Sequence, residues 1–227
     1  MLAQEIILNP NIKLLLVASI ITILFFYTRK NKKHKYIDPS ITPPFKLNIP
    51  LTGSLQHLGG MLLDDKHVLH VSRWPHDLGE EVRLTGVDKV NISRKIVSKE
   101  TLEYYDQGDI SILSLDKPID ILNHRRLDIV EPKVGEQVTV IRQGRPPFGT
   151  YIESIDNKKN IIYLSSESDL DSIFLAGDSG KPWLVKRDGK LCMISFTSYG
   201  KKGTGALLYN YNDKIKNTLA VLNSKED

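Results

Sequence analysis

Residues 176–182 read AGDSGKP. This stretch places Ser179 directly before Gly180, with Gly177 two residues earlier. Glycines permit the tight backbone that exposes a serine hydroxyl while nearby N–H groups point towards a developing oxyanion. The pattern is typical of a nucleophilic serine. Because Gly-Asp-Ser-Gly also occurs by chance in turns, the surrounding chain must supply the context.

The chain after residue 51 consists of short apolar segments that are rich in β-branched residues and separated by Gly, Pro, Asn and Asp. Regular short strands of this kind indicate a barrel or sandwich rather than a wound α/β sheet. The segments expected to form strands are 60–63, 67–71, 81–84, 110–115, 137–141, 161–164, 182–185, 191–196 and 206–209. Only the C-terminal end is predicted to be helical, with Asp213 as its cap and Ile215, Leu219 and Leu222 on one face.

The serine turn and the chain after it resemble the chymotrypsin-like serine proteases, whose nucleophile turn reads Gly-Asp-Ser-Gly-Gly-Pro. Only Lys181 departs from that pattern, at the second glycine after the serine. The strand 183–185, the strand 191–196 and the segment Ser198-Tyr-Gly200 follow in the family's order. This resemblance covers roughly residues 51–225. It implies an all-β, chymotrypsin-like double β-barrel with a C-terminal helix.

The same resemblance implies a catalytic triad in the chain order His, Asp, Ser. Ser179 would be the nucleophile. Asp109 stands before the apolar strand 110–115, where the family places its aspartate. The N–H groups of Gly177 and Ser179 would form the oxyanion hole.

The catalytic histidine is the ambiguous member of the triad. An alignment without gaps from Gly59-Gly60 places the catalytic position on Arg73, which cannot act as a base at neutral pH. A hairpin shorter by three residues places it on His70 instead, followed by Val71 as in many family members. His76 is a third option that needs a longer connection. We take His70 as the predicted base and keep His76, or no histidine at all, as alternatives.

The resemblance also suggests the residues that bind substrate. Ile173, six residues before the serine, stands at the floor of the primary pocket. Ser195 lies in the segment that pairs with substrate, and Thr197 stands at the pocket mouth. Since the floor carries no acidic residue, cleavage after Lys or Arg is not implied, and an apolar or small side chain is expected.

Residues 1–36 are predicted to anchor the chain in a membrane. The stretch 14–27 reads LLLVASIITILFFY and is uncharged, and five basic residues follow within 29–35. A cleaved secretory signal would carry its positive charge before the apolar run. The arrangement therefore predicts one transmembrane helix with the downstream domain on the cytoplasmic side. Residues 37–50, with four prolines, are predicted to form a tether, and 51–227 the folded domain.

Charge and cysteine content exclude several classes of partner. The formal net charge is +4, but residues 1–36 alone carry +5, so the remainder carries −1. No nucleic-acid partner is expected from such a balance. The single cysteine, Cys192, cannot form an intramolecular disulfide, and no Cys/His spacing suggests a metal. We predict no metal and no cofactor.

The sequence therefore predicts a membrane-anchored serine endopeptidase that hydrolyses polypeptides through Ser179, His70 and Asp109. One alternative is a catalytically inactive pseudoprotease of the same fold, a protein-binding module with Arg73 in place of the base. The other is a membrane-tethered all-β interaction domain unrelated to proteases, in which the serine turn is accidental.

Residues 1–36 fused to a soluble reporter should hold that reporter in membranes, because the apolar run would be buried in hydrocarbon. The measurement is the distribution of the reporter between pellet and supernatant after extraction with alkaline carbonate. Release of the fusion into the supernatant would contradict the predicted anchor.

Overall fold

The structure is a computed structural model. It describes residues 45–50, 57–73, 76–86, 91–104, 109–119, 127–142, 145–165, 177–198 and 203–224. The chain divides into the units Met1–Lys35 and Tyr36–Asp227, and the predicted membrane segment lies outside the described residues. Within the described ranges, no helix has the length and apolar character needed to cross a membrane.

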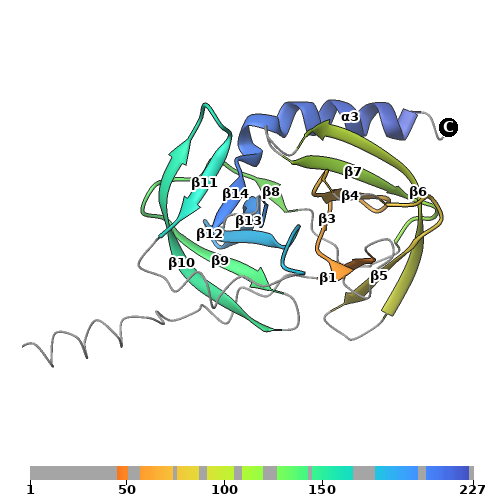
Figure 1. Cartoon of the computed structure of the whole chain (residues 1–227), viewed down its shortest axis with the longest axis horizontal. Helices are drawn as coiled ribbons and strands as arrows, with labels where there is room; N and C mark the ends of the chain where they lie inside the picture. The colour runs from red at the N-terminus through yellow and green to blue at the C-terminus, as the bar shows by residue number, and fades with distance from the viewer. Residues whose placement is uncertain are drawn as a thin grey trace, which may run out of the picture. The chain divides into compact units, whose positions relative to one another are not determined.

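Strands from the N-terminal half of the second unit form one seven-stranded sheet with the order β2-β1-β5-β6-β7-β4-β3 (Figure 1). All its pairings are antiparallel. Its members are β1 (Phe45–Pro50), β2 (His57–Leu58), β3 (Met61–Leu62), β4 (His67–His70), β5 (Glu81–Gly86), β6 (Asn91–Glu103) and β7 (Ile110–Leu115).

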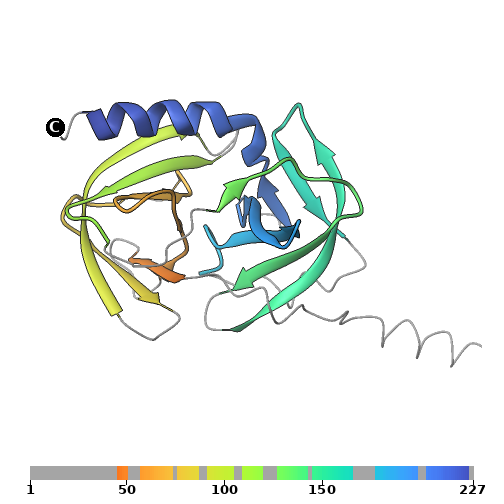
Figure 2. The same ribbon diagram turned by 180° about the vertical axis from the view of Figure 1, so that it is seen from behind.

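The C-terminal half forms a second seven-stranded sheet, with the order β14-β11-β10-β9-β12-β13-β8. Its members are β8 (Asp128–Ile129), β9 (Gln137–Arg142), β10 (Arg145–Asp156), β11 (Ile161–Leu164), β12 (Pro182–Arg187), β13 (Lys190–Phe196) and β14 (Thr204–Ala206). Both sheets curl into half-barrels, as the views from the two sides show (Figures 1 and 2). The expected all-β double barrel is confirmed.

Long, irregular strands bend both sheets. In the first sheet, the register between β6 and β7 shifts at Ile96/Ser98 and again at Thr101/Glu103. In the second, β10 shifts against β9 between Arg145 and Phe148. Such bulges kink a strand and increase its twist, which lets one strand cross from one side of a barrel to the other. The sheets can therefore close around their apolar side chains.

The C-terminal helix α3 (Asn212–Ser224) follows the 3-10 turn η1 (Leu208–Tyr211) and lies over β6 and β7 (Figures 1 and 2). Its buried residues Ile215 and Leu219 join a core cluster with Leu102 of β6 and Ile110 of β7. The ammonium group of Lys214 donates to the carbonyl oxygen of Leu102 at 2.6 Å. The predicted helix is confirmed, and it fastens the end of the chain to the first sheet.

Several predicted boundaries differ from the structure. β1 (Phe45–Pro50) lies within the stretch that was expected to be a tether, and it pairs with both β2 and β5. The expected strand 206–209 ends at Ala206 because η1 begins at Leu208. Asp213 lies inside the first turn of α3 instead of capping it, where its charge still favours the helix N-terminus.

Replacing Ile215 by alanine should lower the free energy of unfolding by about 2–5 kcal/mol, because it leaves a cavity between α3 and the first sheet. Val221 on the same helix is 52% exposed, so Val221→Ala is the matched control and should change stability by less than about 0.5 kcal/mol. Denaturant unfolding of both variants checks this. Equal effects of the two substitutions would contradict the docking of the helix.

Candidate active site

The serine turn enters the second sheet immediately before β12 and is held by backbone hydrogen bonds on both sides. The carbonyl oxygen of Ser179 accepts from the N–H of Gly59 at 2.7 Å, and the N–H of Gly180 donates to Thr197 at 2.9 Å. Gly180 has a φ of +77°, and a Cβ atom there would collide with the carbonyl oxygen of Gly59. Glycine at this position is therefore required by both conformation and close approach.

An ion pair with a neighbouring strand also holds the serine turn. The Asp178 side chain is 1% exposed, and its Oδ2 accepts from Nη2 of Arg145 at 2.5 Å. Arg145 belongs to β10, so the aspartate next to the serine is tied to the sheet beneath it. Removing one member of a buried pair leaves an uncompensated charge. Loss of this ion pair would therefore destabilise the conformation of the turn.

Asp109 lies directly before β7 and is fully buried. Its φ of +58° turns the carboxylate towards a set of donors. Oδ1 accepts from the hydroxyl of Ser72 at 3.1 Å and from the N–H of Arg73 at 2.9 Å. Oδ2 accepts from the hydroxyl of Ser198 at 2.7 Å and also forms an ion pair with Arg73 Nη1.

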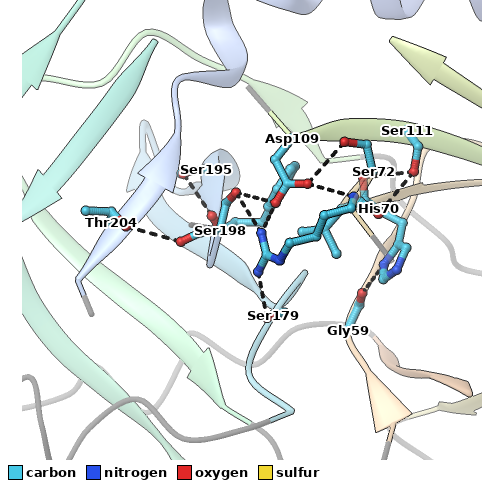
Figure 3. Close-up of polar contacts among 12 residues, drawn as sticks. Gly59, His70, Ser72, Asp109, Ser111, Ser179, Ser195, Ser198 and Thr204 are labelled. Carbon is cyan, nitrogen blue, oxygen red and sulfur yellow. Dashed lines mark hydrogen bonds and ion pairs between the residues drawn. The ribbon is translucent and has the colours of Figure 1, made fainter. Parts of the chain in front are cut away.

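Arg73 connects this carboxylate to the serine. Its Nη1 donates to Asp109 Oδ2, and its Nη2 donates to Ser179 Oγ at 2.9 Å (Figure 3). The side chain is 17% exposed. The structure thus brings Ser179 and Asp109 to the same guanidinium. The group that links them is a guanidinium and not an imidazole.

His70, the predicted base, lies at the end of β4 and is completely buried. Its Nδ1–H donates to the carbonyl oxygen of Gly59 at 2.7 Å (Figure 3). Its Nε2 has no hydrogen-bond partner among the residues that the structure describes. Neither ring nitrogen is hydrogen-bonded to Ser179 or Asp109. The reason is the register of β4, which carries the chain on through Val71 and Ser72 before it reaches the serine at Arg73.

The alternative base, His76, lies against His70 with the two ring centroids 4.7 Å apart. Its own side chain is buried, and its Nδ1 is 3.6 Å from Oε2 of Glu80. Burial lowers the pKa of His70 well below its usual value, and the neighbouring His76 lowers it further. The two histidines form a buried pair beside the serine turn.

The predicted pocket residues have structural contacts of their own. Ser195 is fully buried, and its hydroxyl donates to the carbonyl oxygen of Ala206 at 2.7 Å. Thr197 Oγ1 accepts from the indole N–H of the buried Trp183 at 3.0 Å. Ile173 lies outside the described residues.

Ser198 is a residue of this site that was not predicted from the sequence. It lies just after β13, is fully buried, and donates to Asp109 (Figure 3). Its signal was the segment Ser198-Tyr-Gly200 immediately after the apolar strand. The fold brings Ser198 next to Asp109, which directly precedes β7.

Comparison with solved structures shows the fold. Over 78% of this chain and 96% of the other, the structure is similar to kallikrein-related peptidase 10, with a TM-score of 0.61 and 17% identity. The fold is that of the chymotrypsin-like serine proteases. A second structure, kallikrein-related peptidase 10 in complex with Zn²⁺, matches over 78% of this chain and 95% of the other, with a TM-score of 0.59 and 16% identity.

The similarity to these peptidases is one of structure. No protein-family model matches the chain, and no curated protein matches it either. Within the described ranges, no group of three His, Cys, Asp or Glu side chains is placed to hold a metal ion.

The free energy of unfolding should fall as the pH drops below about 6.5. The reason is that His70 becomes protonated in the unfolded chain, whereas burial keeps it neutral in the folded protein. The loss from this one group approaches about 1.4 kcal/mol per pH unit. In His70→Asn, an amide can still donate to Gly59 but cannot titrate, so the decline should be shallower. The measurement is the urea midpoint of both proteins between pH 7.5 and 5. Identical pH dependence would contradict a neutral, buried imidazole.

Proposed function

We propose that this protein is a catalytically inactive member of the chymotrypsin-like fold that binds polypeptides at the site around Ser179. One observation carries the proposal: Arg73 stands between Asp109 and Ser179 and donates to both. In a working triad this place belongs to a neutral imidazole, which removes the proton of the serine hydroxyl during attack.

Arginine cannot perform that step. Its guanidinium has donors only, and it stays protonated in proteins. The serine hydroxyl is hardly ionised at neutral pH and needs a base to become a nucleophile. The carboxylate of Asp109 is separated from Ser179 by the arginine, and His70 is hydrogen-bonded to Gly59. The rest of the site supports binding, because the turn, the buried carboxylate and Ser198 keep a rigid arrangement.

The N-terminal segment defines the proposed location. We propose that residues 1–36 anchor the protein in a membrane as a single span, with the barrels on the cytoplasmic side. Support comes from the uncharged stretch 14–27 and the basic residues that follow it. The proposed partners are a polypeptide at the serine site and the membrane itself.

The full-length protein should not react with a fluorophosphonate probe, whereas Arg73→His should. The substitution places an acceptor nitrogen between Asp109 and Ser179, and general-base catalysis contributes about 10²–10⁴-fold to the rate. Arg73→Gln is the matched control, because glutamine also shortens the side chain but supplies no base. Ser179→Ala combined with Arg73→His confirms the labelled residue. The measurement is the rate of covalent labelling in folded protein.

Labelling of the wild-type protein would contradict the proposal and support the serine endopeptidase expected from the sequence. In that case His70→Ala and His76→Ala would identify the base, because only loss of the true base removes the label. An unlabelled wild type together with a labelled Arg73→His variant supports the inactive reading and proves that the remaining site is intact.

A further inference from the structure

The direction of one hydrogen bond determines what the serine can bind. Between Arg73 Nη2 and Ser179 Oγ, only the arginine can donate, since a guanidinium has no acceptor. Ser179 therefore accepts, and its own O–H proton is available to a further group. The described parts of the chain provide no acceptor for that proton. In a triad, the imidazole would be the acceptor.

The backbone of the turn adds two more donors. Neither the N–H of Gly177 nor that of Ser179 donates a hydrogen bond to another described residue. Both belong to the turn that Asp178 fixes through its ion pair with Arg145. Ser179 and Arg73 are both only partly buried. Because a guanidinium stands where a triad has an imidazole, the serine hydroxyl, the guanidinium and the two backbone N–H groups are all hydrogen-bond donors.

The carboxylate of Asp109 does not oppose an anion at this place. Both of its oxygens accept from donors of Ser72, Arg73 and Ser198, and the side chain is fully buried. Lys99 adds a positive charge nearby, because its Nζ donates to the carbonyl oxygen of Ser72 at 2.8 Å. Since the charges of Asp109 and Arg73 balance each other, the charge of Lys99 leaves a net positive charge beside Ser72, which favours a negative acceptor.

We propose that the serine site binds a carboxylate group. One carboxylate oxygen accepts from Arg73 and the Ser179 hydroxyl, and the other accepts from the N–H groups of Gly177 and Ser179. This inference rests on the proposed absence of catalysis and names the ligand chemistry of the same site. The carboxylate can come from the C-terminus of a polypeptide or from a small organic acid, since both present two oxygens in one plane.

The test uses the full-length protein in detergent with ¹⁵N-labelled glycine and serine. The amide resonances of Gly177 and Ser179 are followed during titration with sodium acetate, and sodium chloride at equal ionic strength is the control. N-acetyl-trialanine with a free carboxylate is then compared with the same peptide carrying a C-terminal amide. The acid should bind about tenfold or more tightly than the amide, because hydrogen bonds to a charged acceptor are stronger than hydrogen bonds to a neutral one.

Two variants connect the binding to the site. Arg73→Gln should weaken acetate and peptide-acid binding most, although it also removes a partner of Asp109 and can destabilise the fold. Ser179→Ala leaves Asp109 fully bonded, and it should weaken binding severalfold while the thermal midpoint stays close to that of the wild type. If the peptide acid binds more tightly than acetate, the source is a polypeptide terminus. Saturable binding of acetate without a gain from the peptide indicates a small acid.

The inference is overturned if neither carboxylate shifts the two resonances saturably, if chloride has the same effect, or if acid and amide bind equally. Failure of the underlying functional proposal has a different signature. The same samples are treated with the fluorophosphonate probe, and labelling of the wild type rejects the absence of catalysis. An unlabelled protein without carboxylate preference rejects only the ligand.

Discussion

The guanidinium of Arg73 joins the two halves of the molecule at their most constrained point. Arg73 follows β4 and Asp109 precedes β7, and both of these strands belong to the first sheet. Ser179 precedes β12 and Ser198 follows β13, which belong to the second sheet. The buried carboxylate needs a partner, because an unpaired charge in the interior costs several kcal/mol. Arginine meets this need with a planar fork that reaches both the carboxylate and the serine. The residue that stands between Asp109 and Ser179 thus also links the two halves.

Much of the second sheet could be predicted from the sequence because its strands are short, apolar and separated by turn residues. β11 has the predicted bounds, and β12 and β13 begin within one residue of them. β6 was missed because polar and charged residues dominate Asn91–Glu103, with Ile96 and Leu102 as its buried apolar residues. β10 was missed because prolines follow its first residue. Long strands that bend around a barrel bury only part of their length, so hydrophobicity alone gives them little signal.

The site shows a similar division between local and nonlocal information. Ser179 and Asp109 could be placed because each lies at the start of a strand with a recognisable neighbourhood, and the structure brings them to one arginine. The histidine could not be placed because β3 and β4 allow more than one register from sequence alone. The pairing of His67 with Ser114 and of His70 with Ser111 settles that register. It points His70 into the interior and brings Arg73 to the serine. Ser198 depends on contacts between segments far apart in the chain, which no local pattern reveals.

The ion pair between Asp178 and Arg145 forms when the second sheet folds. The turn that carries the serine is anchored by a side chain of β10, and both partners are present as soon as the second sheet has formed. No cut in the polypeptide is required to create the positive charge that holds the turn. Folding of the second sheet therefore brings together both charges that hold the serine turn.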